Sequence, residues 1–173
     1  ALPLRPPAGR LLGHRVALTG LGAARRCRHG IARTQQMPLP SVGMTVFEIV
    51  VVGAMQVAGQ RRSGANGRVV DVLETCGLMD VANRRAGDLG LLDRKRLELA
   101  RALATDPKVL FLDEIGGGLT DAEAAELVVT TKELRRRGIA INWIEHIVPI
   151  IVQAMDRLIC PVAGRLTADG VPT

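Results

Sequence analysis

Aromatic residues are nearly absent from this sequence, which has one tryptophan, two phenylalanines and no tyrosine in 173 residues. Proteins that bind RNA or single-stranded nucleic acid stack bases on aromatic side chains. The composition therefore argues against that class of protein. Hydrophobic residues still make up 47% of the chain, so we expect a globular protein whose core is built from leucine, valine, isoleucine and alanine.

Cysteine is also scarce, and Cys27, Cys76 and Cys160 lie far apart with no CxxC spacing. Neither a disulfide framework nor a zinc site is indicated, and we expect reduced thiols. No signal-peptide pattern opens the chain. The main apolar stretch, residues 46–58, is interrupted by Glu48 and is too short to cross a bilayer. We therefore expect a soluble chain that does not insert into the membrane.

Acidic residues are fewer than basic ones, 17 against 23, which gives a net charge of +6. A basic surface can attract nucleic acid, nucleotide or anionic lipid. The arginine clusters at 25–26, 61–62, 84–85 and 135–137 are scattered along the sequence. We interpret most of them as solvated helix ends and loops, because they are not gathered on one helix.

The length fits one domain with a sizeable core. Two capping boxes, Thr45 with Glu48 and Thr120 with Glu123, predict helices over about 45–57 and 120–137. The other predicted elements are a hairpin at 11–21, a helical turn at 23–29, strands at 31–34, 109–112, 139–144 and 158–162, helices at 68–76, 93–104 and 148–155, and a flexible loop at 59–67. Helices and strands alternate from residue 100 onward, which is typical of a parallel α/β sheet.

The most informative segment is the apolar run at 109–112, which ends on the adjacent carboxylates Asp113 and Glu114. A short apolar run of this kind predicts a central strand of a parallel sheet. Such sheets bind ligands at the carboxyl ends of their strands. The pair therefore suggests a site for Mg²⁺ and a nucleotide, although an isolated pair of acids after a strand is more often simply solvated.

Five segments follow one another in a recognisable order: IARTQQ ending at Gln36, GMTVFE at 43–48, the block LLDRKRLELARALATDPKVLFLDE at 91–114, GLT ending at Thr120, and WIEH ending at His146. This order resembles the nucleotide-binding subunit of ATP-binding cassette (ABC) transporters, most specifically that of branched-chain amino acid importers. The resemblance implies a P-loop NTPase-like α/β fold with a parallel sheet. It further implies one partial ATP-binding domain over 1–173, with a helical subdomain at about 37–95 and a RecA-like core at about 96–173.

The resemblance also implies roles for individual residues. Gln36 matches the Q-loop glutamine, a Mg²⁺ ligand and sensor of the membrane partner, and an amide oxygen suits that hard cation. Asp113 matches the aspartate that holds Mg²⁺, and Glu114 matches the catalytic glutamate that acts on water. His146 matches the histidine that contacts the γ-phosphate, which an imidazole N–H can do.

Two further nucleotide-binding segments are implied. The place of the signature motif, in which a helix N-terminus faces the phosphate bound to the opposite subunit, is taken by Leu89, Gly90, Leu91, Leu92 and Asp93. The place of the D-loop is taken by a segment that includes Gly118 and Thr120. Several positions differ from the common family pattern, since Gly90 replaces a serine, leucines replace both signature glycines and Ile115 replaces a proline.

The sequence contains no G-x-x-x-x-G-K motif followed by Ser or Thr, the loop that grips the β- and γ-phosphates. The aromatic residue that stacks on adenine in this family is missing as well. We therefore expect a domain that lacks the amino-terminal segment, binds ATP weakly and is inactive alone. A fragment, a partial reading frame and a degenerate copy all remain open as explanations.

The resulting functional hypothesis is an ATP-binding and ATP-hydrolysing subunit of an importer for branched-chain amino acids or related small polar solutes. It implies ATP and Mg²⁺ as cofactors, transmembrane permease subunits and a second ATP-binding subunit as partners, and a peripheral position on the cytoplasmic face of the plasma membrane. One alternative is a non-catalytic remnant that docks on a permease or subunit. A nucleic-acid-associated ATPase is least favoured, because no helix presents a coherent basic face.

Overall fold

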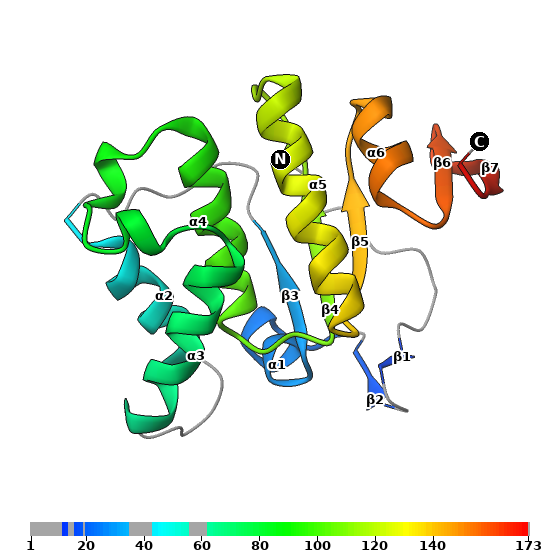
Figure 1. The fold of residues 1–173 in the computed structure, drawn as a ribbon. Coiled ribbons are helices and arrows are strands. Elements are labelled where there is room, and N and C mark those ends of the chain that lie inside the picture. The colour runs from blue at the N-terminus through cyan, green and yellow to red at the C-terminus, as the bar shows by residue number, and fades with distance from the viewer. Residues whose placement is uncertain (1–11, 14–15, 19, 35–42, 56–61, 173) are drawn as a thin grey trace.

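A three-stranded parallel sheet forms the centre of the fold (Figure 1). Its order is β3 (Ile31–Arg33), β4 (Val109–Asp113) and β5 (Ala140–Ile144). The computed structural model describes residues 12–13, 16–18, 20–34, 43–55 and 62–172, with the backbone alone at 12–13, 16–17 and 62–66. The sheet confirms the predicted α/β fold class and the central position of the strand that ends at Asp113.

The register of the sheet separates its side chains into two rows. On one face Leu110 and Leu112 are fully buried, and Trp143 beside Leu112 is 8% exposed. On the other face Phe111 is half-buried and pairs in register with the exposed Arg33. This alternation follows from the pleat of the strands, which sends successive side chains to opposite faces.

Helices cover the leucine face of the sheet. The long helix α5 (Asp121–Arg136) runs alongside β4 and β5 in Figure 1, and its buried residues belong to the same core cluster as Leu110 and Leu112. Helix α4 (Leu91–Leu103) leads into β4, and α6 (Val148–Ala154) follows β5. This arrangement matches the predicted alternation of helix and strand.

A group of helices lies beside the sheet, on the far side of α4 from α5 (Figure 1). It contains α2 (Val46–Met55), α3 (Arg62–Thr75) and the 3₁₀ turns Met79–Val81 and Ala86–Asp88. One face of α2 is buried in the core, with Val50 fully buried and Ala54 nearly so, whereas Val52 and Met55 are exposed. The division into a helical subdomain and a RecA-like core stays a prediction.

Both predicted capping boxes are present. Thr45 donates its backbone N–H to Glu48 Oε2 at 2.8 Å, and Thr120 does the same to Glu123 Oε2 at 2.8 Å. The return bonds run from the N–H groups of Glu48 and Glu123 to the threonine hydroxyls. The bonds that the carboxylates accept, from the threonine N–H groups first and then from the hydroxyls, lower the pKa values of both glutamates because they stabilise the charged form.

The predicted flexible loop at 59–67 is wrong in its second half. Helix α3 begins at Arg62, whereas residues 59–61 lie outside the described part of the chain. Two glycines at 64 and 67 suggested a loop, but their low helix propensity is a weak preference. Helix formation is cooperative, so the packed turn around Val69 and Leu73 can extend the helix toward its amino end.

The carboxyl-terminal strand does not continue the parallel sheet within the described residues. Instead β6 (Leu158–Val162) pairs antiparallel with β7 (Arg165–Gly170). The two residues between the strands, Ala163 and Gly164, both have positive φ values of 48° and 76°. That conformation is typical of a tight hairpin turn, which joins adjacent antiparallel strands.

The first elements agree with the sequence analysis. Strands β1 (Leu12–Gly13) and β2 (Val16–Ala17) form an antiparallel pair, and the short helix α1 (Ala23–Arg28) leads to β3. Gly30 ends that segment with a φ of 79°. Among the described residues, no helix is both long and apolar enough to cross a membrane.

Candidate functional site

The carboxyl ends of β4 and β5 bring the two most important predicted segments to one edge of the sheet. Asp113 and Ile144 are partners in the register, so Glu114 and the segment that contains His146 leave the sheet side by side. The N–H of Glu114 donates to the carbonyl oxygen of Ile144 at 2.8 Å, which joins the two segments directly. This edge is where parallel α/β sheets bind ligands.

Asp113 is held by the neighbouring strand β3. Its Oδ2 accepts a hydrogen bond from Arg33 Nη2 at 2.6 Å, and its backbone N–H donates to Thr34 Oγ1 at 3.1 Å. The Asp113 side chain is 15% exposed, whereas that of Arg33 is 69% exposed. The carboxylate is therefore only partly accessible and is balanced by a solvated arginine, which the sequence analysis did not single out.

The backbone of Glu114 has an unusual conformation for a residue with a side chain, with a φ of 49°. Its carbonyl oxygen accepts from Lys95 Nζ at 3.1 Å and from the N–H of Gly117 at 3.3 Å. Lys95 lies on α4 and is only 8% exposed. This buried lysine links α4, which begins within the predicted signature motif, to the predicted catalytic glutamate. The sequence analysis did not single it out.

The predicted signature and D-loop segments meet within the chain. A Cβ atom on Gly118 would lie 3.1 Å from Leu91 Cδ2, so the two segments are in close contact there. Gly118 also has a φ of 81°, which favours glycine. Thr120 begins α5, and its hydroxyl is engaged in the capping box rather than turned to a ligand.

The residues of the predicted signature motif have different surroundings. Leu89 is buried, and its carbonyl oxygen accepts from Arg94 Nε at 2.8 Å. Gly90 is the exposed N-cap of α4. Because glycine has no side chain, this N-cap offers no side-chain acceptor to the first N–H groups of the helix. Leu91 is exposed, Leu92 is half-buried, and Asp93 forms an ion pair with Arg96.

Gln36 lies outside the described residues, so its predicted role as a metal ligand stays a prediction. Within the described part of the chain, no cluster of three or more His, Cys, Asp or Glu side chains could hold a metal ion. The carboxylate of Asp113 is a hard oxygen ligand of the kind that Mg²⁺ prefers. One such ligand is consistent with Mg²⁺, which is commonly held by one or two carboxylates together with phosphate oxygens and water.

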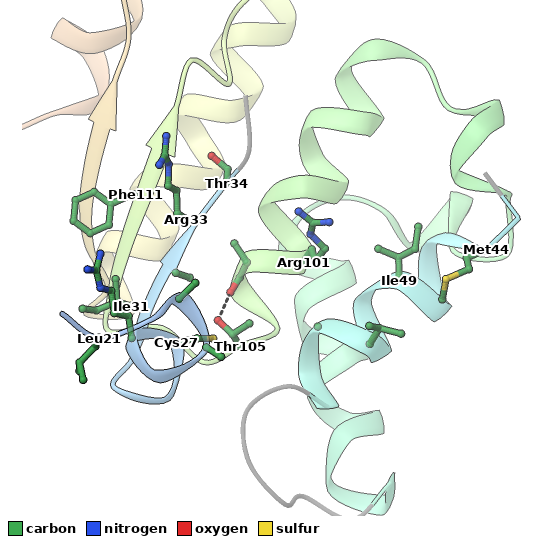
Figure 2. Close-up of a pocket in the computed structure, with 17 residues that line it drawn as sticks. Leu21, Cys27, Ile31, Arg33, Thr34, Met44, Ile49, Arg101, Thr105 and Phe111 are labelled. Atoms are coloured by element: carbon green, nitrogen blue, oxygen red, sulfur yellow. Dashed lines mark hydrogen bonds between the residues drawn. The ribbon is translucent and has the colours of Figure 1, made fainter. Parts of the chain in front are cut away.

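A groove of about 1140 Å³ lies next to this edge rather than at it (Figure 2). It lies between α1 and β3 on one side and α2 and α4 on the other. Arg33, Thr34, Phe111, Ile49 and Arg101 are among its lining residues. Neither Glu114 nor His146 lines it, so the groove and these predicted catalytic residues are separate features. Arg33 and Thr34, which line the groove, both form hydrogen bonds with Asp113.

The sequence profile of the ABC transporter family matches residues 4–116. The chain belongs to the ABC transporter family. It is 33% identical over 183 aligned positions to the high-affinity branched-chain amino acid transport ATP-binding protein LivG of Escherichia coli strain K12, an alignment that covers 97% of this chain and 72% of that protein. A probable LivG of Methanocaldococcus jannaschii is 27% identical, with 96% and 70% covered. The resemblance to cassettes of branched-chain amino acid importers is thus confirmed.

Solved structures agree with this assignment. The nucleotide-free ATP-binding cassette of an ABC transporter matches with a TM-score of 0.81 and 26% identity, covering 92% of this chain and 68% of that one. The structure of cbiO1 from Clostridium perfringens, part of an ABC transporter complex, matches with a TM-score of 0.84 over 98% of this chain and 68% of that one. Because the two sequences are only 24% identical, this match shows a shared fold alone.

Proposed function

We propose that this chain acts as the ATP-binding and ATP-hydrolysing subunit of an importer for branched-chain amino acids or related small polar solutes. The proposal rests on one observation. Asp113-Glu114 and the segment that contains His146 leave the parallel sheet side by side at the same edge. The similarity to LivG over nearly the whole chain supports the substrate class.

In this proposal each residue at the edge has one task. Asp113 holds Mg²⁺, which neutralises phosphate charge when a nucleotide is bound. The Arg33 guanidinium bonds to Asp113 Oδ2, so a metal would bind through Oδ1 or displace this arginine. Glu114 orients the attacking water, and its clamped backbone limits the positions that its carboxylate can reach. His146, whose side chain is 69% exposed, is available to a phosphoryl oxygen.

The proposed partners are transmembrane permease subunits and a second ATP-binding subunit. The exposed amino end of α4 at Gly90 would face a phosphate held by that second subunit. The proposed location is the cytoplasmic face of the plasma membrane. Because these 173 residues contain no phosphate-gripping G-x-x-x-x-G-K motif, we expect weak binding of ATP and negligible turnover by the chain alone.

Titration of the chain with a fluorescent ATP analogue tests the proposal. We expect weak binding that needs Mg²⁺ and that falls about tenfold in Asp113→Asn, because a metal-bound carboxylate is replaced by a neutral amide. Asp156→Asn is the matched control, since Asp156 is an exposed carboxylate after α6. Binding that ignores both Mg²⁺ and Asp113 would contradict the proposed site. It would favour the alternative of a non-catalytic docking module, which the missing motif also suggests.

A further inference from the structure

Glu145 has a completely buried side chain between two exposed neighbours. Its side chain is 0% exposed, whereas that of His146 is 69% exposed and Ile144 is 54% exposed. A buried carboxylate is costly unless hydrogen bonds stabilise its charge. The partners of Glu145 therefore indicate what this residue does.

Both carboxylate oxygens of Glu145 accept hydrogen bonds from segments of the candidate site. Oε2 accepts from the N–H of Gly116, in the loop after β4, at 3.0 Å. Oε1 accepts from the N–H of His146 at 3.0 Å. The same Oε1 lies 3.3 Å from His146 Nδ1. One carboxylate thus joins the loop that follows Glu114 to both the backbone and the imidazole ring of His146.

The contact with Nδ1 has a consequence for the protonation of the ring. A carboxylate can only accept hydrogen bonds, so a neutral imidazole facing it carries its proton on Nδ1. The other ring nitrogen, Nε2, is then left for a ligand. We propose that Glu145 is a positioning residue that selects the Nδ1–H tautomer of His146 and fixes this ring to the loop at Gly116. The value of this arrangement for phosphate contact rests on the function proposed above.

Gly116 limits where the carboxylate can lie. A Cβ atom at this position would be 3.0 Å from Glu145 Oε2 and 2.9 Å from Ile150 Cδ1, on α6. Both distances are too short for an unperturbed contact, so an added methyl group must displace Glu145, Ile150 or both. The absence of a side chain at residue 116 therefore allows the carboxylate to approach the loop backbone closely.

The test is ¹⁵N NMR of histidine side chains in the 173-residue chain without nucleotide. In the wild-type chain, at a pH at which the ring is neutral, we expect the Nδ1–H form of His146 to exceed the Nε2–H form by about tenfold, because the carboxylate attracts a proton on the nitrogen that lies 3.3 Å away. In Glu145→Gln this ratio should fall toward equality, because the side-chain amide is uncharged and has one acceptor oxygen where the carboxylate has two. His29 serves as an internal control, and Glu133→Gln on α5 is the matched carboxylate control. An unchanged ratio in Glu145→Gln would overturn the proposal.

Amide hydrogen exchange provides a second readout. In Glu145→Ala we expect exchange at Gly116 and His146 to accelerate about tenfold, because each N–H loses its acceptor. Exchange at Leu112 should not change, and Glu145→Gln should restore protection at one of the two amides. Gly116→Ala should change the His146 tautomer ratio while the carboxylate is retained. Equal acceleration throughout the core would overturn the positioning role. Because these measurements need no nucleotide, failure of ATP binding would contradict only the proposed function.

Discussion

The two faces of the parallel sheet carry similar apolar side chains in very different surroundings. Leu110 and Leu112 on one face are 0% exposed beneath α5 and its neighbours. On the other face, Val109 and Phe111 of the same strand are half-buried, and Ile144 of the next strand is 54% exposed. The helices of the described residues therefore cover one face much more completely than the other.

This difference shows what an apolar strand specifies and what it does not. The run Val109–Leu112 is apolar at every position, which is typical of a strand that is buried on both faces. Alternation along the strand decides which side chains share a face, but the cover comes from other elements. The candidate site lies where both faces end, so its residues combine a well-packed support with accessible side chains.

The largest expected effect is the difference in stability loss between alanine substitutions at two neighbouring residues of β4, Leu112 and Phe111. We expect Leu112→Ala to lower the free energy of unfolding by about 2–5 kcal/mol, because it leaves a cavity in the packed core. Phe111→Ala should cost less than half as much, since Phe111 is only half-buried. Urea unfolding measures both, with Leu110→Ala as the control on the covered face. Equal losses at positions 111 and 112 would mean that the second face is covered as well as the first.

A smaller effect is expected at the start of α5, the helix that covers the leucine face. Thr120→Ala removes the N-cap hydroxyl and should cost about 1 kcal/mol of stability at neutral pH. Thr45→Ala removes the same motif from α2 and should have a similar cost, which makes it the matched control. Thermal unfolding measures both. No loss at position 120 would show that the end of this helix is stabilised by other contacts.

The pH dependence of that cap follows from the lowered pKa of Glu123. A glutamate with a folded-state pKa below its ordinary value of 4.5 stabilises the protein above that pH. This contribution is lost as the pH falls through the folded-state pKa. The stability difference between the wild-type chain and Thr120→Ala should therefore shrink below about pH 4.5. A constant difference down to pH 3 would contradict a contribution from the bond between the Thr120 hydroxyl and the Glu123 carboxylate.

The smallest expected effect concerns Glu98, a buried residue of α4. Burial raises the pKa of its carboxyl group, and the ion pair with Arg101 at 2.8 Å opposes that increase only in part. When the folded-state pKa of an acid is raised, the folded protein loses stability as the pH rises from the ordinary pKa through the raised one. We expect Glu98→Gln to be more stable than the wild-type chain at pH 7, by roughly 0.5 kcal/mol. The gain should vanish below the ordinary glutamate pKa of 4.5. A loss of stability at pH 7 would show that the ion pair outweighs desolvation.

Local sequence signals predicted much of the fold. The capping boxes fixed the starts of α2 and α5, and Gly77 and Gly138, with φ values of 64° and 86°, follow the ends of α3 and α5. The predicted loop at 59–67 was wrong from residue 62 onward, because cooperative helix extension depends on neighbouring segments. The parallel pattern expected from residue 100 onward also fails at β6, which pairs in a hairpin with β7. These errors lie outside the candidate site.

The order of motifs in the sequence also identified the family, and it predicted Asp113, Glu114 and His146 as site residues. It could not identify Arg33, Lys95 or Glu145 as their partners. Arg33 lies 80 residues from Asp113 along the chain, and Glu145 lies 29 residues from Gly116. No periodicity or spacing in a single sequence encodes such distant hydrogen bonds.

The sequence by itself determined the kinds of element, their order and the carboxylates that end the central strand, because those features depend on local propensity and on the pattern of apolar residues. Only the tertiary structure decided which face of the sheet is covered and which buried charges hold the loops at its edge. Burial of Lys95 and of the Glu145 side chain requires hydrogen-bond partners from distant segments. Such partners exist only once the parallel strands are in register.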